Sequence, residues 1–145
     1  MSEDGASLPS VRDAIRELRI ELVILNDRVA RSVKLQPRDL DILDVVDREG
    51  PCTPSQIADR IGWSRATVTG VLTRLEADNW IERETNPTDG RSMTIRSTGR
   101  FAELNAAYAA VDREVDDRAR ATEAAAFIVE TTKRLRRINR SDAAI

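Results

Sequence analysis

The sequence predicts a mainly α-helical α+β fold, and three observations support this prediction. Apolar residues recur at helical spacing near both ends of the chain. Two short helical segments meet at Gly62, which is typical of a helix-turn-helix. Alternating apolar and polar residues then flank a turn-rich stretch, as in a β-hairpin. Together these patterns predict a winged helix-turn-helix core with helical extensions at both ends.

Composition and charge exclude several classes of protein. The 145 residues are 41% hydrophobic and 33% charged, which suits one domain with a real core. The formal net charge is −2, so the chain as a whole carries no basic signal for nucleic acid. One cysteine and no histidine exclude an internal disulfide and His-dependent nucleophilic catalysis, and disfavour a Cys/His zinc site. We therefore expect that the protein is not an enzyme and that it binds no cofactor and no metal.

The start of the chain and its hydropathy predict a soluble cytoplasmic protein. Residues 1–8 are polar and acidic, unlike a signal peptide, and we expect them to be disordered. No apolar run approaches the roughly 20 residues that a membrane span requires, so no membrane partner is expected.

The first helix is predicted from a heptad-type seam. Its apolar positions alternate between spacings of four and three residues, at Val11, Ile15, Leu18, Leu22, Leu25 and Val29. Over residues 20–25 the sequence IELVIL is apolar on nearly every side. In so small a domain, this pattern favours burial of the helix against a second chain.

The second helix begins at Pro37, and a glycine–proline pair at 50–51 ends it. Its inner face carries Leu40, Leu43 and Val46. The spacing of these residues predicts that this helix packs into the core.

Two capped helices follow in immediate succession. Thr53 is the expected N-cap of the third helix, and Gln56 stands where a capping box needs its partner. Gly62 ends that helix, and Ser64 is the expected cap of the fourth. The tight connection between them predicts the helix-turn-helix.

After Asn79 the period changes from helical to alternating. WIERET at 80–85 and SMTIRS at 92–97 predict two strands, and NPTDGR between them predicts a turn. From Phe101 a helical pattern resumes, and a last helical segment carries apolar residues at Phe127, Ile128, Leu135 and Ile138. No glycine or proline follows Gly99, so the sequence leaves open whether the last two helices are separate, and Thr122 is the expected place of a break.

These elements predict three regions besides the N-terminus. Residues 37–99 form a winged helix-turn-helix DNA-binding region. Residues 9–36 and 100–140 form helices whose heptad-like seams predict an intertwined dimerisation region with twofold symmetry. The alternative is that the same helices pack on each other within a monomer.

The fourth helix has an unusual outer face. Val68, Leu72 and Leu75 supply a core stripe on one side. The opposite side carries only small residues, Ala66, Thr69, Gly70, Thr73 and Ala77. Such a face lets a helix sit deep in a DNA major groove about 12 Å wide, where threonine hydroxyls and methyls reach base edges. The alternative is that this face packs against another helix of the protein.

Polar and basic residues around this helix complete the candidate DNA-binding set. Residues in its first turn suit phosphate or guanine, and Arg91 at the hairpin tip suits a minor groove, with Asp89 able to hold its guanidinium. Arg83 and Arg96 point away from the hairpin core and suit phosphates. The candidates are Ser64, Arg65, Ala66, Thr67, Thr69, Gly70, Thr73, Arg74, Arg83, Asp89 and Arg91.

The stretch GPCTPSQIADRIGWSRATVTGVLTRLEADNWIER at 50–83, followed by Asp-Gly-Arg at 89–91, resembles the multiple-antibiotic-resistance regulator (MarR) family of bacterial transcription factors. The resemblance implies that the fourth helix is the recognition helix, that Arg91 enters a minor groove and that Asp89 supports it. It also implies homodimers on double-stranded DNA at pseudo-palindromic operators, commonly as repressors. Many members lose DNA affinity when a small, often phenolic, effector binds.

The sequence also departs from the family pattern. The family follows its wing with Leu-Thr-x-x-Gly, whereas this chain has Ser-Thr-Gly-Arg-Phe at 97–101. The family's peroxide-sensing branch uses a cysteine in the N-terminal helices, whereas Cys52 precedes the third helix and suits a small buried apolar position. No residues for a phenolic effector carry over. The competing function is a winged-helix protein-interaction module that ignores DNA sequence.

Overall fold

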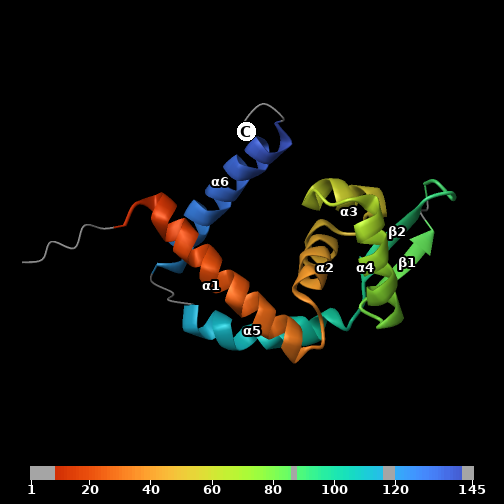
Figure 1. The fold of residues 1–145 in the computed structure, drawn as a ribbon, viewed down its shortest axis with the longest axis horizontal. Helices are drawn as coiled ribbons and strands as arrows, with labels where there is room; N and C mark the ends of the chain where they lie inside the picture. Colours follow the sequence, from red (N-terminus) through yellow and green to blue (C-terminus); the bar gives the residue numbers. More distant parts are fainter. Residues whose placement is uncertain (1–8, 86–87, 116–119, 142–145) are drawn as a thin grey trace, which may run out of the picture. The chain divides into compact units, whose positions relative to one another are not determined.

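The computed structural model describes residues 9–85, 88–115 and 120–141. In chain order the elements are α1 (Val11–Ser32), α2 (Pro37–Glu49), α3 (Pro54–Ile61), α4 (Arg65–Ala77), β1 (Ile81–Thr85), β2 (Met93–Ser97), α5 (Phe101–Val115) and α6 (Ala121–Arg140) (Figure 1). This order confirms the predicted winged-helix fold. The expected disorder at 1–8 lies outside the described residues. Contacts divide the chain into two units, Met1–Ala107 and Tyr108–Ile145.

The helix-turn-helix begins where the capping signals place it. The Thr53 hydroxyl accepts the Gln56 N–H at 3.2 Å, and the Gln56 amide oxygen accepts the Thr53 N–H at 2.8 Å, which is a complete capping box. Gly62 ends α3 at φ 79°, a left-handed conformation that favours glycine. The Ser64 hydroxyl accepts the Thr67 N–H at 3.1 Å and caps α4. The local sequence therefore fixes where α4 begins.

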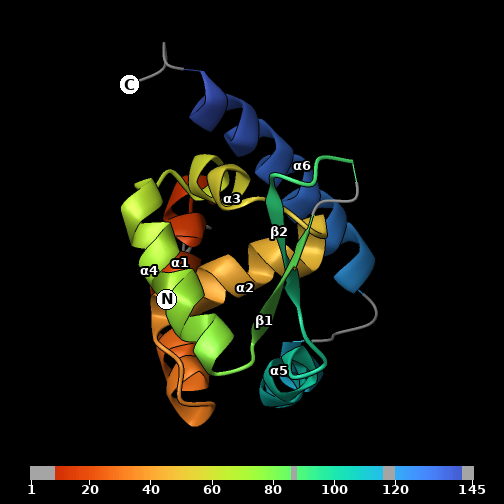
Figure 2. The same cartoon turned by 90° about the vertical axis from the view of Figure 1, so that its right-hand side faces the viewer.

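The core of the first unit lies among α2, α3, α4 and the hairpin. Figure 2 shows α2 between α4 and the two strands, and α3 packs against both α2 and α4. The largest fully buried side chains include Leu40, Ile42, Leu43, Val46, Ile57, Val68, Leu72, Leu75, Trp80, Ile81 and Ile95. Each such side chain stabilises the fold by about 1.5–3 kcal/mol relative to leaving it in water. This core holds α4 rigidly with one side outward.

The wing is a two-stranded antiparallel sheet. Ile81 pairs with Ser97 and Thr85 with Met93, which confirms the predicted hairpin. Cys52 forms an additional isolated bridge to β2, with Ile95 N–H donated to the Cys52 carbonyl at 2.7 Å. The Cys52 side chain is buried, and burial raises the pKa of its thiol above the usual value. These observations favour the small, buried, unreactive role for Cys52.

The flanking helices differ from the core helices in their exposure. In α1 only Val29 and Ala30 are buried, and α6 has no buried residue among those described. The start of α5 at Phe101 agrees with the expected resumption of the helical pattern despite the displaced glycine. The break expected at Thr122 is wrong, because Thr122 lies in the first turn of α6. Threonine was only a weak signal there, since it is tolerated inside helices.

None of the helices in the described ranges is both long and apolar enough to cross a bilayer.

Candidate nucleic-acid interface

The two sides of α4 have opposite character. Val68, Leu72 and Leu75 are fully buried on the inner side. The small residues Ala66, Thr69, Gly70, Thr73 and Ala77 are all exposed on the outer side. Within the described residues, nothing from this chain packs over that side as a second helix would. The outer face is therefore open to a partner from outside.

Gly70 lies in the middle of this open face. A Cβ built at Gly70 meets no atom within 4 Å, so packing inside the described chain does not require glycine. Glycine in a helix interior costs about 1 kcal/mol relative to alanine. A residue with that cost and no internal reason points to a close approach from outside the chain.

The first turn of α4 presents hydroxyls and one unpaired cation. The Ser64 and Thr67 hydroxyls lie 2.8 Å apart and hydrogen-bond to each other. Further along, the Thr73 hydroxyl donates to the Thr69 carbonyl at 2.9 Å. Arg65 is exposed and forms no ion pair with any described residue. Its charge is therefore available to an anionic partner.

Arg74 contributes to the fold through an ion pair between two helices. Its guanidinium pairs with Asp39, which is 1% exposed and also accepts the Gln36 N–H at 2.8 Å. A buried carboxylate needs such a partner, because an unpaired buried charge is costly. Arg74 therefore has a role between α2 and α4, and its sequence-based assignment to DNA stays a prediction.

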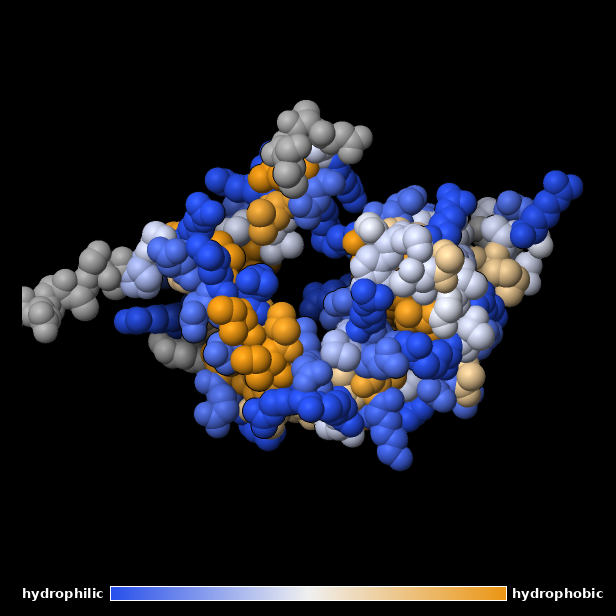
Figure 3. Space-filling view, in the orientation of Figure 1, coloured by the Kyte–Doolittle hydropathy of each residue, from blue (hydrophilic) through white to orange (hydrophobic). Residues whose placement is uncertain are grey.

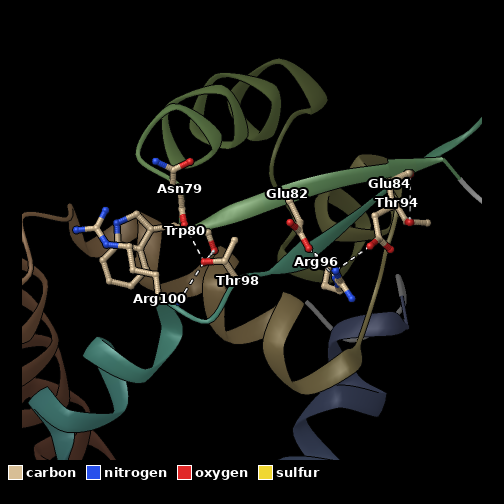
Figure 4. A network of polar contacts seen from close by, with 8 residues as sticks. All are labelled: Asn79, Trp80, Glu82, Glu84, Thr94, Arg96, Thr98 and Arg100. Carbon is tan, nitrogen blue, oxygen red and sulfur yellow. Dashed lines mark hydrogen bonds and ion pairs between the residues drawn. The ribbon is translucent and has the colours of Figure 1, made fainter.

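The outward arginines of the wing are paired as well. Arg83 Nε donates to Glu76 at 2.9 Å and links β1 to α4. Arg96 is held by Glu82 and Glu84, with 2.8 Å to the Glu84 carboxylate (Figure 4). The hydrogen bond to Glu82 and the charge of Glu84 raise the pKa of Arg96. These two arginines are less available to phosphate than their charge alone predicted.

The wing tip keeps one free cation among the described residues. Arg91 is exposed and forms no ion pair with any of them. Asp89 does support it, but through the main chain, since its carboxylate accepts the Arg91 N–H at 3.0 Å. The expected pair between the Asp89 carboxylate and the Arg91 guanidinium does not form, because the short aspartate side chain satisfies the turn instead. No described side chain therefore forms an ion pair with the guanidinium of Arg91.

Two arginine–tryptophan contacts were not predicted from the sequence. Arg38 lies over the Trp63 ring at 5.4 Å, and Arg100 lies over the Trp80 ring at 4.4 Å. Figure 4 shows Arg100 at the base of the wing, where the Thr98 hydroxyl donates to the Asn79 carbonyl at 2.7 Å. Each pair joins residues about 20 or more positions apart, so no local spacing signals it.

Known proteins share both the sequence and the fold of this region. The family model described as MarR family matches residues 33–92. YcgE of Bacillus subtilis (strain 168), an uncharacterized HTH-type transcriptional regulator, is 31% identical over 80 residues, covering 55% of this chain and 52% of YcgE. The HTH-type transcriptional regulator PecS of Dickeya dadantii (strain 3937) is 36% identical over 83 residues, covering 54% of this chain and 50% of PecS. The chain matches about half the length of each of these relatives.

The solved structures extend the likeness beyond the matched segment. Transcriptional regulator Tm0710 from Thermotoga maritima has a TM-score of 0.65 and 25% identity, covering 88% of this chain and 92% of its own. Wild-type apo MarR from E. coli has a TM-score of 0.64 and 16% identity, and the match covers 89% of this chain and 98% of the MarR chain. Overoxidized AbfR bound to DNA has a TM-score of 0.56 and 20% identity, and the match covers 86% of this chain and 91% of the AbfR chain. Residues 33–92, which hold the helix-turn-helix and most of the wing, are therefore similar to the MarR family in sequence, and most of the chain shares the fold of these solved regulators.

Proposed function

We propose that this protein is a transcriptional regulator that binds a specific duplex DNA site as a homodimer. One observation carries the proposal: α4 has an exposed face of small residues, and neither Arg65 at its start nor Arg91 at the wing tip forms an ion pair with a described residue. A helix with such a face reaches base edges in the major groove. Both sequence relatives are described as transcriptional regulators, and we propose no catalytic activity.

The roles of the site residues follow from their placement. Ala66, Thr69, Gly70 and Thr73 set the depth of α4 in the groove and its base preference, and the first turn with Ser64, Arg65 and Thr67 meets phosphate or guanine. Arg91 reaches the neighbouring minor groove, where a narrow groove concentrates negative potential. Asp89 holds the turn that presents it. One structural relative, AbfR, was solved bound to DNA, which supports this mode of use of the fold.

Exposed apolar seams support the homodimer. Leu18 and Leu22 of α1 are 49% and 45% exposed, and Phe127 and Ile128 of α6 are also exposed. Figure 3 shows hydrophobic residues gathered along α1 and on α6. Monomeric proteins in water rarely leave such large apolar surfaces uncovered. We propose that residues 9–36 and 100–140 cover these seams with those of a second copy.

We further propose repression of a promoter that contains a pseudo-palindromic operator, relieved by a small-molecule effector. The match of residues 33–92 to the MarR family model supports this part. In vitro transcription from a template with the bound site at its promoter tests it: added protein is expected to lower transcript yield, and a rise in yield would instead identify an activator.

DNA binding is tested by fluorescence anisotropy at several salt concentrations. The probes are a duplex enriched from a randomised pool and a scrambled duplex of the same length. We expect tighter binding to the enriched duplex and a steep fall in affinity with salt. A winged-helix module for protein partners would bind both duplexes equally weakly at low salt and would retain a non-identical protein from an extract.

A further inference from the structure

Arg38 occupies an unusual position next to the start of the recognition helix. Its guanidinium lies 5.4 Å from the centroid of the Trp63 ring. Trp63 immediately precedes Ser64, the N-cap of α4, and is half-buried. Arg38 belongs to α2, so this contact brings a cation from another helix to the first residues of α4. Arg38 and Arg65 therefore lie near the same end of the recognition helix.

The charge of Arg38 is not neutralised by an ion pair with any residue that the structure describes. Arg38 is exposed and forms no ion pair with a described residue; burial raises the pKa of nearby Asp41, and the charge of Arg38 opposes only part of that rise. By contrast Arg60, Arg74, Arg83 and Arg96 each pair with a carboxylate. An arginine held on an aromatic ring keeps its N–H edges free, because stacking uses the flat face of the guanidinium. Arg38 is thus both positioned and available.

We infer that Arg38, held by Trp63, is a phosphate-binding residue for the DNA strand that borders the groove occupied by α4. This inference rests on the proposed function. A major groove about 12 Å wide places phosphates on both sides of an inserted helix. A cation beside the first turn of α4 lies where one of these phosphate rows passes. Arg38 contacts phosphate and not bases, so it contributes affinity without sequence preference.

Trp63 is the positioning residue in this arrangement. A free arginine side chain loses much of its rotamer freedom when it binds a phosphate. The ring orders the guanidinium before DNA arrives, so less freedom is lost on binding. The competing reading is that the contact only stabilises α2 against α4. That reading predicts a change in folding stability without a change in the salt dependence of DNA binding.

The test compares two substitutions on the same helix. Arg38→Gln and Arg48→Gln remove the same charge from α2, and their positions are about 15 Å apart along the helix. Affinities for the enriched duplex and the scrambled duplex are measured from low to high salt. We expect Arg38→Gln to lower both affinities by the same factor, about three- to tenfold. The slope of log K against log salt should flatten by about 0.9 per protomer, hence about 1.8 for a dimer.

Two further variants separate charge from positioning. Arg38→Lys keeps the charge and should retain most of the salt slope while losing part of the affinity. Trp63→Leu should weaken binding by itself and should reduce the effect of adding Arg38→Gln, since the two residues act together. Far-ultraviolet circular dichroism and thermal melts check that each variant is folded.

Trp63 also reports on the contact directly. Trp80 is 1% exposed, so acrylamide quenching of the tryptophan emission arises mainly from the half-buried Trp63. Adding the enriched duplex should protect Trp63 from acrylamide in the wild type, and this protection should be absent from Trp63→Leu.

The outcomes discriminate between the inference and the proposed function. If Arg38→Gln affects binding no more than Arg48→Gln, Arg38 is not a phosphate contact, while the proposed function stands. If Arg38→Gln selectively weakens the enriched duplex, Arg38 reads bases and the inference is overturned. If the wild type binds neither duplex, the proposed function fails and the inference fails with it.

Discussion

Helices α1 and α4 both carry an apolar stripe at helical spacing, but the structure treats the two stripes differently. In α4 the stripe is fully buried at Val68, Leu72 and Leu75. In α1 the stripe stays exposed over most of its length, and only Val29 and Ala30 at its end are buried. The comparison shows that an apolar pattern predicts burial but does not identify the surface that covers the stripe. The stripe of α4 belongs to the core of one chain, and we propose that the stripe of α1 belongs to an interface between two chains.

The largest expected effect is a loss of folding stability when the buried stripe of α4 is shortened. Leu72→Ala removes a fully buried side chain from between α4 and the rest of the core. We expect the free energy of unfolding to fall by about 2–5 kcal/mol, because the cavity collapses only in part. Urea unfolding measures this loss, which should appear at every protein concentration. A loss below about 1 kcal/mol would mean that α4 packs less firmly than the structure shows.

A substitution in the exposed stripe of α1 tests whether that stripe lies in an interface between two chains. Leu22→Arg places a charge in the exposed seam, where it does not disturb the core of a single chain. We expect the helical content to remain while the dimer dissociates, with a dimer dissociation constant raised about 100-fold, or about 2.7 kcal/mol. Sedimentation velocity over a range of concentrations measures the change. A variant that remains dimeric at micromolar concentration would show that α1 does not contribute to the interface.

Arg74 distinguishes a residue of the fold from a residue of the DNA site. Arg74→Gln leaves Asp39 buried without its cation, so we expect the free energy of unfolding to fall by about 1–3 kcal/mol. The salt slope of DNA binding should stay as in the wild type once the variant is folded. A flatter slope with unchanged stability would return Arg74 to the DNA interface.

A substitution at Gly70 tests whether the exposed small-residue face of α4 enters the major groove. Gly70→Gln has space within the chain, because nothing lies within 4 Å of the added Cβ, and stability should rise slightly from better helix propensity. We expect the preference for the enriched duplex over the scrambled one to fall by about 1–3 kcal/mol, since the long side chain holds the helix out of the groove. The matched control Ala77→Gln lies at the end of the same face, farther from the first turn. An unchanged preference in Gly70→Gln would argue against groove insertion at this position.

The smallest effect concerns the acidic side of α2. Burial raises the pKa of Asp44, and the charges of Asp41 and Asp47 add to the rise while Arg48 opposes it. The folded-state pKa then exceeds the unfolded value, so ionised Asp44 weakens the fold as pH rises above 3.8 and through the folded-state pKa. Asp44→Asn should stabilise the protein near neutral pH by less than about 1 kcal/mol, because the side chain is partly solvated. The difference in urea midpoint between variant and wild type should close as the pH is lowered.

Local rules explain which parts of the fold the sequence predicts. The caps at Thr53 and Ser64 and the turn at Gly62 depend on neighbours within four residues, and the structure confirms them. The break between α5 and α6 was expected at Thr122, which lies inside α6, because no glycine or proline marks the true boundary. Periodicity therefore located the helices better than it located their ends.

The contacts that refine the site are not local, and the sequence did not predict them. Arg74 meets a carboxylate that lies 35 residues earlier, and Arg38 meets a tryptophan 25 positions later. The sequence analysis named Arg65, Arg74, Arg83, Arg91 and Arg96 as candidates for DNA and did not name Arg38. The structure separates the paired ones from Arg38, Arg65 and Arg91, and that separation is what sharpens the proposed interface.

The central claim is that the open face of α4, with Arg65 and Arg91 beside it, binds duplex DNA with sequence preference. The most direct measurement is the anisotropy titration of the wild type against the enriched and scrambled duplexes, repeated at several salt concentrations. We predict an affinity ratio of about 10³ or more in favour of the enriched duplex, and affinities for both duplexes that fall steeply with salt. Equal affinity for the two duplexes at every salt concentration, or no binding at low salt, would contradict the claim.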